Sequence, residues 1–364
     1  MTVALHAHEL DPRLATGIAR YARGLIGGLQ HVDRDLAVVA TAQGCGTVPD
    51  GQVVLHHQRR DLNKRWLLTR RPLFEDLVTA AEPAIGEISV VHATAPIIPL
   101  PTRRPLVVTI HDLTPVTHPD WFSPAARFYF RRCLPWIRRR ADAVIVPTET
   151  VAAQVHETLN LGDRPIVVTG EGVDIGWLGD DPSGQTLLRH HLTAGSYLLH
   201  LGAVTRRKNL DVLLEAITGT DDVLVLAGPT AVGADEVHAA AAAMPDRVRV
   251  LGRVDDEDIG PLLRGARALV HPSLFEGFGL TILEAMAVGT PVICSDGGAL
   301  PEVAGDAALI APGSSPEAWR AAFDAVQSDA ERERLTNAGL IRAQHYSWET
   351  VAASTARIYA ALGA

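Results

Sequence analysis

The sequence predicts an α/β protein made of two domains, each built on a parallel sheet. Short β-branched apolar runs alternate with helical patterns along the chain, which is typical of βαβ units. At 364 residues, the chain exceeds the size at which a single hydrophobic core keeps growing. The rhythm breaks over residues 176–196, where glycine and aspartate indicate a connection. We expect an N-terminal domain over 1–178, a C-terminal domain over 179–347 and a final helix over 348–364 that can cross back to the first domain.

The expected strands are short runs dominated by valine, isoleucine, leucine and alanine. In the first domain they are Val3–His6, Leu36–Thr41, Gln52–His56, Ser89–His92, Leu106–Ile110, Ala143–Val146 and Ile166–Val168. In the second they are Tyr197–Gly202, Val223–Ala227, Val248–Leu251, Ala268–His271 and Pro291–Cys294. Helices are expected at Gly17–Gln30, Pro124–Arg139 and Trp348–Leu362, and from near Leu210, Asp235, Asp256, Leu280 and Leu300. Because doubly wound sheets bind ligands at the carboxyl ends of their strands, functional residues should lie in the loops after strands.

The composition excludes several classes of protein. With 47% hydrophobic and 21% charged residues, the chain is globular rather than disordered. The net charge of −9 lies entirely in residues 181–364, which argues against a nucleic-acid partner. Three cysteines without a Cys-x-x-Cys spacing give neither a disulfide framework nor a zinc site, so a cytoplasmic protein is expected. The sequence contains no stretch of 18 apolar residues, so no membrane span is expected. Its first ten residues lack a basic region and a long apolar core, so no export signal is expected either.

The most specific segment follows the strand that ends at His271. Gly277 and Gly279 permit close backbone approach, and the free N–H groups of the helix that begins near Leu280 offer an anion site. Glu276 lies in the loop and Glu284 about one turn into the helix, so both carboxylates could accept hydrogen bonds from the hydroxyls of a ribose or a sugar ring. The alternative interpretation is an ordinary strand–loop–helix that carries two surface glutamates.

This segment resembles the Glu-x7-Glu signature of the retaining glycosyltransferases of family 4, whose GT-B fold has two Rossmann-like domains facing across a cleft. Other segments follow in the family's order along nearly the whole chain. Thr16-Gly-Ile-Ala-Arg resembles the first glycine loop, Ile110-His-Asp the His-Asp loop, Gly202-Ala-Val-Thr-Arg-Arg-Lys-Asn the Arg-Lys phosphate motif, and Leu251-Gly-Arg-Val the nucleobase loop. One departure is Glu171-Gly-Val-Asp, where the family often has Asn-Gly-Val-Asp.

The resemblance assigns roles to residues of both domains. Arg207 and Lys208 would neutralise the donor diphosphate, although a solvated basic turn is the alternative for such a charge run. Gly17 would approach the pyrophosphate, and His111 would meet the donor sugar near its C6 hydroxyl or the leaving site. The remaining donor contacts implied by the family are the backbone of Val254 and the loop and helix residues Gly277, Phe278, Gly279, Leu280 and Glu284.

No metal site or cofactor is expected. The histidine pairs His6 and His8, His56 and His57, and His190 and His191 lack a convincing third ligand. Asp256 and Asp258 resemble an Asp-x-Asp motif, but acidic residues at a helix start favour the macrodipole and are common there. In place of a metal, Arg207 and Lys208 would carry the charge of the leaving diphosphate.

The function expected from the resemblance is retaining transfer of a sugar from a nucleotide diphosphate donor to a hydroxyl group. Related mannosyl- and rhamnosyltransferases of polysaccharide and glycolipid assembly favour GDP-mannose as the donor and a glycan or lipid-linked acceptor. The alternatives are a GT-B sugar-nucleotide epimerase, which would act on its donor without an acceptor, and a catalytically silent sugar-nucleotide-binding subunit. The intact family residues argue against the silent subunit.

Two arginine-rich clusters suggest peripheral contact with an anionic membrane or a lipid-linked acceptor. The first surrounds Trp66-Leu-Leu68 within residues 59–71, and the second interleaves Phe128, Tyr129, Phe130 and Trp136 with arginines of the helix over 124–139. The alternative is that the aromatic rings face the core and the arginines are merely solvated. This alternative is the favoured one for the second cluster.

Overall fold

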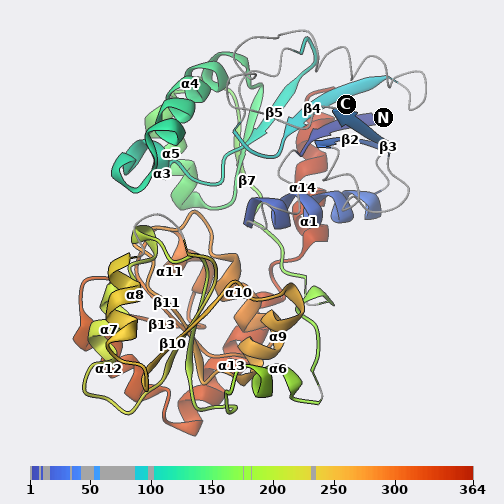
Figure 1. Cartoon of the computed structure of the whole chain (residues 1–364). Coiled ribbons are helices and arrows are strands. Elements are labelled where there is room, and N and C mark those ends of the chain that lie inside the picture. Colours follow the sequence, from blue (N-terminus) through green and yellow to red (C-terminus); the bar gives the residue numbers. More distant parts are fainter. Residues whose placement is uncertain are drawn as a thin grey trace. The chain divides into compact units, whose positions relative to one another are not determined.

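The computed structural model describes residues 2–7, 10, 17–32, 35–41, 53–57, 87–96, 102–174, 176–181, 183–230 and 235–363 (Figure 1). The chain divides into two compact units, one formed by residues 1–172 with 347–364 and the other by residues 173–346. The division thus falls at Gly172 and Val173, ahead of the expected boundary after residue 178. Each unit holds one parallel sheet, as the sequence predicted.

The first unit contains a seven-stranded parallel sheet in the order β3-β2-β1-β4-β5-β6-β7. All seven expected strands are present: β1 (Thr2–His6), β2 (Asp35–Thr41), β3 (Val53–His57), β4 (Ile88–Ala93), β5 (Leu106–Thr109), β6 (Ala143–Val146) and β7 (Ile166–Val168). The central strands β5 and β6 are buried along their whole length, because helices cover both faces of the sheet. The strand order reverses between β1 and β4, which marks the point where such sheets bind ligands.

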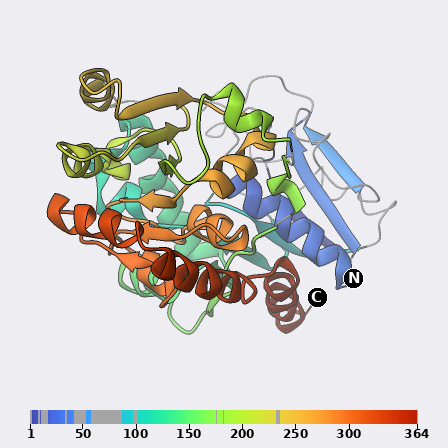
Figure 2. The same ribbon diagram turned by 90° about the horizontal axis from the view of Figure 1, so that it is seen from below.

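Helices cover the two faces of this sheet in pairs. One face packs against α1 (Gly17–His31) and α14 (Trp348–Ala361), and the other against α4 (Pro124–Arg140) and α5 (Glu149–Leu159). Short helical turns lie over Thr114–Thr117 (α3) and Pro119–Trp121. The expected return of the last helix to the first domain is therefore found, and α14 lies beside α1 in both ribbon views (Figures 1 and 2).

The second unit contains a six-stranded parallel sheet in the order β10-β9-β8-β11-β12-β13. Its strands are β8 (Leu198–Leu201), β9 (Leu224–Ala227), β10 (Val248–Gly252), β11 (Ala268–His271), β12 (Val292–Cys294) and β13 (Leu309–Ile310). The apolar pattern of the sequence does not predict β13, because this strand has only two residues and Ile310 is exposed. The order reverses between β8 and β11, whose residues Leu198 and Leu199 pair with Ala268 and Leu269.

Five helices of the second unit begin where the sequence placed them: α7 (Leu210–Ile217), α8 (Asp235–Ala242), α9 (Asp256–Gly265), α10 (Leu280–Ala287) and α11 (Leu300–Ala304). The sequence did not predict α6 (Gln185–Arg189), α12 (Pro316–Ala325), α13 (Asp329–Ala343) or the 3₁₀ turn at Gly176–Leu178. Residues of α7, α8 and α12 share one apolar core with the sheet, and residues of α9, α10 and α11 share the other. The unit is thus a three-layer α/β sandwich.

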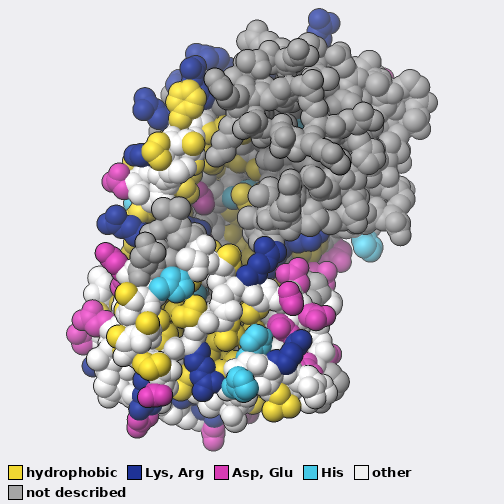
Figure 3. All heavy atoms as spheres, viewed as in Figure 1, with side chains coloured by type: hydrophobic (Ala, Val, Ile, Leu, Met, Phe, Trp, Pro, Cys, Tyr) yellow, Lys and Arg dark blue, Asp and Glu magenta, His cyan; other side chains and the backbone are white. Residues whose placement is uncertain are grey.

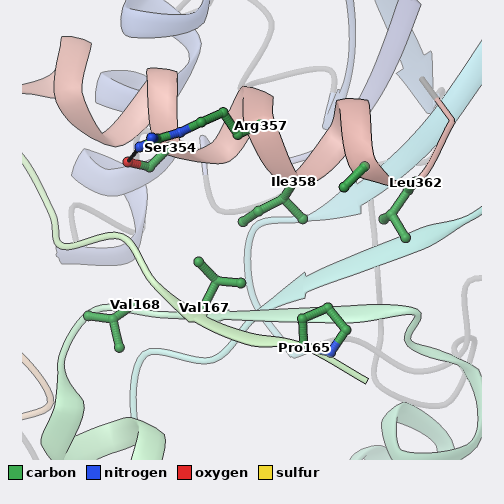
Figure 4. Close-up of a pocket in the computed structure, with 8 residues that line it drawn as sticks. Pro165, Val167, Val168, Ser354, Arg357, Ile358 and Leu362 are labelled. Carbon is green, nitrogen blue, oxygen red and sulfur yellow. Dashed lines mark hydrogen bonds between the residues drawn. The ribbon is translucent and has the colours of Figure 1, made fainter. Parts of the chain in front are cut away.

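An apolar pocket of about 290 Å³ lies between the edge strand β7 and α14 (Figure 4). It is lined by Pro165, Val167, Val168, Ser354, Arg357, Ile358, Ala361 and Leu362. The only ionisable side chain in this lining, that of Arg357, donates a hydrogen bond to the Ser354 hydroxyl across 3.0 Å. The pocket therefore brings together no group suited to catalysis.

The contact between α1 and α14 depends on glycines, because the two backbones approach closely. A Cβ atom placed on Gly28 would lie 2.4 Å from the carbonyl oxygen of Trp348, whereas one placed on the adjacent Gly27 would meet no described atom within 4 Å. A backbone oxygen cannot move aside without displacing its helix, so Gly28 fits only with hydrogen in place of a side chain.

We predict that Gly28→Ala lowers the free energy of unfolding by about 1–3 kcal/mol, as overpacking does. Gly27→Ala is the matched control and should raise stability by about 0.5–1 kcal/mol, since alanine loses less backbone entropy within a helix. Urea unfolding monitored by circular dichroism measures both. Equal effects of the two substitutions would show that the close packing of α14 on α1 is wrong.

Candidate functional site

The second unit brings three of the predicted site residues together. Arg207 and Lys208 lie on a 3₁₀ turn (Arg206–Lys208) that follows β8, and Glu276 lies in the loop between β11 and α10. The Nη1 atom of Arg207 lies 2.7 Å from Oε2 of Glu276, and Nζ of Lys208 lies 2.6 Å from Oε1. One carboxylate therefore binds two cations. Since β8 and β11 flank the reversal of strand order, this ion cluster stands where a doubly wound sheet binds its ligand.

Backbone contacts hold the two loops in place. The amide of Leu274 donates to the carbonyl oxygen of Arg207 across 2.9 Å, and Nη1 of Arg207 donates to the carbonyl oxygen of Phe275 at the same distance. Asn209 ends the 3₁₀ turn with φ 51° and donates through Nδ2 to the carbonyl oxygens of Pro272 and Gly313. The position of the cations therefore depends on the fold rather than on the ion pair alone.

The electrostatics of the cluster follow from its burial. The side chains of Glu276 and Lys208 are each 12% exposed. Burial alone would raise the pKa of Glu276, but Lys208 and then Arg207 overcome it and hold that pKa well below its usual range. Burial lowers the pKa of Lys208, and the attraction of Glu276 opposes that shift. Two cations and one carboxylate leave one net positive charge, which suits an anionic ligand.

His271 is a member of this cluster that sequence reasoning did not assign. Its Nε2 atom lies 3.3 Å from Oε1 of Glu276, and its ring stacks on that of His200 with centroids 6.0 Å apart. Burial, followed by the charge of Lys208, lowers the pKa of His271, so the neutral ring donates to the carboxylate. The alternation of His200 and His271 with apolar residues in two buried strands was the signal that could have indicated this.

The loop after Glu276 presents backbone rather than side chains. The Phe278 ring is buried and packs edge-on to Tyr346 at 5.6 Å, and Leu280 packs against the same core. Gly279 adopts φ 115° immediately before α10, a conformation that favours glycine. Any contact of Gly277, Phe278 or Gly279 with a donor would therefore come from the backbone.

Glu284 and Val254 occupy the two other predicted positions of the second unit. Glu284 lies in α10 and is only 2% exposed, so its carboxylate is more deeply buried than that of Glu276. Val254 follows β10 and packs partly against the core, which leaves its backbone as the group that could meet a nucleobase. Asp258, in the first turn of α9, is buried and bonds to Thr186, Arg189 and His190. Asp258 thus joins α6 to α9, beyond the helix-start role inferred from the sequence, whereas Asp256 is exposed.

The first unit contains Gly17 and His111. Gly17 begins α1, and the residues just before it lie outside the described part of the chain. His111 follows β5, where its Nδ1 atom lies 2.9 Å from Oε1 of Glu171 and its Nε2 atom 2.9 Å from the carbonyl oxygen of Thr94. The ring of Tyr21 meets the His111 ring edge-on at 4.7 Å. Glu171 was noticed in the sequence only as a departure from the family pattern.

The described residues contain neither a metal-binding cluster nor a membrane-spanning helix. Over these parts of the chain, no group of three His, Cys, Asp or Glu side chains is arranged to hold a metal ion. Nor do the described segments include a helix with the length and hydropathy needed to cross a bilayer.

Two protein-family models match the chain. Residues 192–341 match glycosyl transferases group 1, and residues 15–177 match glycosyltransferase family 4. The chain is 32% identical to O-antigen chain mannosyltransferase B of Escherichia coli, over 70% of this chain and 69% of that protein. It is 32% identical to the MMP alpha-(1->4)-mannosyltransferase of Mycolicibacterium hassiacum, over 70% of this chain and 65% of that protein. It is 28% identical to the phosphatidyl-myo-inositol mannosyltransferase of Mycobacterium leprae, over 75% of this chain and 74% of that protein. The chain thus spans about two thirds to three quarters of these relatives.

Solved structures of similar fold cover nearly the whole chain. Sucrose-phosphate synthase from Thermosynechococcus elongatus superposes with a TM-score of 0.79 at 21% identity, covering 100% of this chain and 99% of that one. The Anabaena protein HepE in complex with UDP and glucose gives a TM-score of 0.73 at 20% identity, covering 99% and 100%. At these identities the likeness shows the fold, which is the GT-B fold of two parallel-sheet domains.

Proposed function

The chain belongs to the glycosyltransferases of family 4, and on this premise we propose that it transfers mannose from GDP-mannose to a hydroxyl group of a glycan or glycolipid, with retention of configuration at the anomeric carbon. The similarity to bacterial mannosyltransferases at 32% identity supports mannose as the sugar. The name of the Mycobacterium leprae relative supports a lipid-linked acceptor.

The observation that carries this proposal is the cluster of Arg207 and Lys208 on Glu276. Departure of a nucleoside diphosphate develops negative charge on phosphate oxygens, and two partly buried cations are suited to stabilise it. In other enzymes a divalent metal supplies that charge. We therefore propose that this transfer needs no metal cofactor.

The reaction that fits a retaining enzyme without a nucleophilic carboxylate is substitution on one face of the sugar. The bond from the anomeric carbon to the phosphate oxygen breaks, and a bond to the acceptor oxygen forms on the same face. The acceptor proton moves to the departing phosphate. In this proposal Glu276 accepts hydrogen bonds from sugar hydroxyls, and His111 lies near the donor sugar or the leaving group.

The direct test is incubation of the purified protein with a panel of nucleotide sugars, with and without a lipid-linked or soluble glycan acceptor and with and without a chelator. Transfer from GDP-mannose that persists with the chelator supports the proposal. Epimerisation of a donor in the absence of any acceptor would overturn it, as would activity that requires added metal.

Removal of either cation should slow the reaction. Lys208→Ala and Arg207→Ala are each expected to lower kcat on the order of 10²–10³-fold, because each removes one contact that stabilises developing charge. Arg206→Ala is the matched control, since Arg206 lies in the same turn but is exposed. Steady-state kinetics and thermal unfolding separate catalysis from stability. Near wild-type kcat in both variants would exclude the phosphate role.

The two carboxylates should have separable effects. Because Glu276 competes with phosphate for Arg207 and Lys208, Glu276→Gln should leave GDP binding as tight as in the wild type or tighter, while kcat falls. Glu284→Gln should weaken GDP binding, since this carboxylate is assigned to the ribose. Calorimetric titration with GDP measures both affinities. Equal weakening in the two variants would contradict this division of roles.

We also propose that α4 contributes to peripheral membrane association. The helix carries six arginines and no acidic residue, and its N-terminal half exposes Phe128, which is 53% exposed and lies beneath the guanidinium of Arg132. Tyr129 and Trp136 pack against the core, so the core-facing alternative holds for them and fails for Phe128.

Figure 3 shows basic and apolar side chains together over α4, at the upper left. Residues 59–71, the first arginine cluster, lie outside the described residues.

Flotation with vesicles of anionic phospholipid tests this proposal. Arg131→Ser combined with Arg139→Ser should weaken association by about 2 kcal/mol, because each arginine near an anionic surface contributes about 1 kcal/mol. The control is Arg332→Ser combined with Arg334→Ser in α13, which removes the same charge from the other unit. No flotation of the wild type at low salt, or equal loss in both variants, would favour a soluble acceptor.

A further inference from the structure

Glu171 and His111 form a largely buried pair in the first unit, and the family pattern assigns a role to His111 but not to Glu171. Glu171 lies three residues after β7, and His111 lies two residues after β5. The Nδ1 atom of His111 is 2.9 Å from Oε1 of Glu171, and the two side chains are 13% and 6% exposed. No role was assigned to Glu171 from the sequence, because 60 residues separate it from its partner.

The hydrogen-bond partners of the His111 ring determine how many protons its two nitrogens and the Glu171 carboxylate share. A carbonyl oxygen only accepts, so the contact of Nε2 with Thr94 requires a proton on Nε2. The contact of Nδ1 with the Glu171 carboxylate then requires one further proton between the two atoms. When Glu171 is ionised, that proton lies on Nδ1 and the ring is an imidazolium.

The surroundings of the ring restrict its orientation, and the nearby side chains of His92 and Tyr21 are neutral. Tyr21 of α1 meets it edge-on, and the Tyr21 hydroxyl bonds to Thr109, which bonds in turn to Nε2 of His92 in β4. Burial, followed by the charge of His111, lowers the pKa of His92 to about 3, so His92 stays neutral. Burial raises the pKa of Tyr21 far above its usual range, so this phenol stays protonated.

The carboxylate next to His111 in the sequence is directed away from the ring. Asp112, the next residue along the chain, accepts hydrogen bonds from the amide and hydroxyl of Thr114, at 3.0 and 2.6 Å. Its carboxylate is thus directed to the turn that begins α3. Glu171 is therefore the carboxylate that pairs with His111 in the described structure.

We propose that Glu171 is a positioning residue for His111, which holds the ring in a fixed orientation and keeps a second proton on it. This inference rests on the proposed function, in which His111 lies near the donor sugar or the departing diphosphate. An imidazolium there would add positive charge where the leaving group becomes negative. An asparagine, which the family often has at this position, could accept the same hydrogen bond but would supply no charge to retain the proton.

The experiment uses Glu171→Gln, which keeps a hydrogen-bond acceptor and removes the charge, and Glu171→Asp, which keeps the charge. Glu157→Gln is the matched control, because Glu157 is exposed on α5 in the same unit. Ring ¹⁵N chemical shifts of His111 are recorded without donor at about pH 7.5, near the ordinary titration range of histidine. The signal is assigned by its loss in His111→Gln.

Two protonated ring nitrogens are expected in the wild type and in Glu157→Gln, and one in Glu171→Gln. The pH at which the second proton is lost should fall by at least about one unit in Glu171→Gln, as expected when an opposite charge within hydrogen-bond distance is removed. A single protonated nitrogen in the wild type, or no change in Glu171→Gln, would overturn the proposal. If Glu171→Gln does not fold, Glu171→Asp is measured instead. Because Glu171→Asp keeps the charge, the pH at which its His111 ring loses the second proton should stay near the wild-type value.

The pH profile of kcat then separates this inference from the proposed function. In Glu171→Gln, kcat should fall about tenfold at pH 7.5 and recover at lower pH, because protonation is restored there, with the KM for the donor unchanged. A loss of kcat that is independent of pH would refute the positioning role. If the chain transfers no sugar at all, the proposed function fails while the ring ¹⁵N measurement still decides whether Glu171 protonates His111.

Discussion

The candidate site depends on one electrostatic constraint, the sharing of the Glu276 carboxylate by Lys208 and Arg207. Each of these groups is largely withdrawn from water, and an isolated buried charge would cost several kcal/mol. Each therefore requires the others, and the two loops that follow β8 and β11 are held together by the same contacts. The backbone amide of Leu274 and the side-chain amide of Asn209 share this task, so the position of the cations does not depend on the ion pair alone.

The order of strands explains why these residues meet. In both sheets the order reverses between two neighbouring strands, and the candidate residues lie in loops after those strands or the next ones. Arg207 and Lys208 follow β8, Glu276 follows β11, Gly17 lies downstream of β1, and the carbonyl of Thr94 follows β4. The same topological rule thus positions polar groups in each unit independently.

Most of the fold could be predicted from the sequence, because its strands are runs of apolar residues buried on both faces, as in β5 and β6. The pattern fails where burial is partial: β13 has two residues with one exposed, and α12 and α13 follow one another outside the βαβ rhythm. For Arg207 and Glu276, the sequence predicted that both lie in loops after strands, but it did not predict the ion pair between them. The pairing of Glu171 with His111 was not predictable, because it arises from the spatial order of β5, β6 and β7.

The two ionic arrangements differ in what a donor would change. At Glu276 the carboxylate contacts both cations, so a diphosphate that binds Arg207 and Lys208 would compete with it and leave more of its acceptor sites to sugar hydroxyls. In the proposed reaction, phosphate binding and release of the carboxylate are therefore one exchange. At His111 no such exchange is needed, because Glu171 contacts Nδ1 and the Nε2 atom donates to the carbonyl oxygen of Thr94. A charge already ordered before the donor arrives costs no reorganisation when the leaving group departs, and this is the condition under which electrostatic stabilisation is most effective.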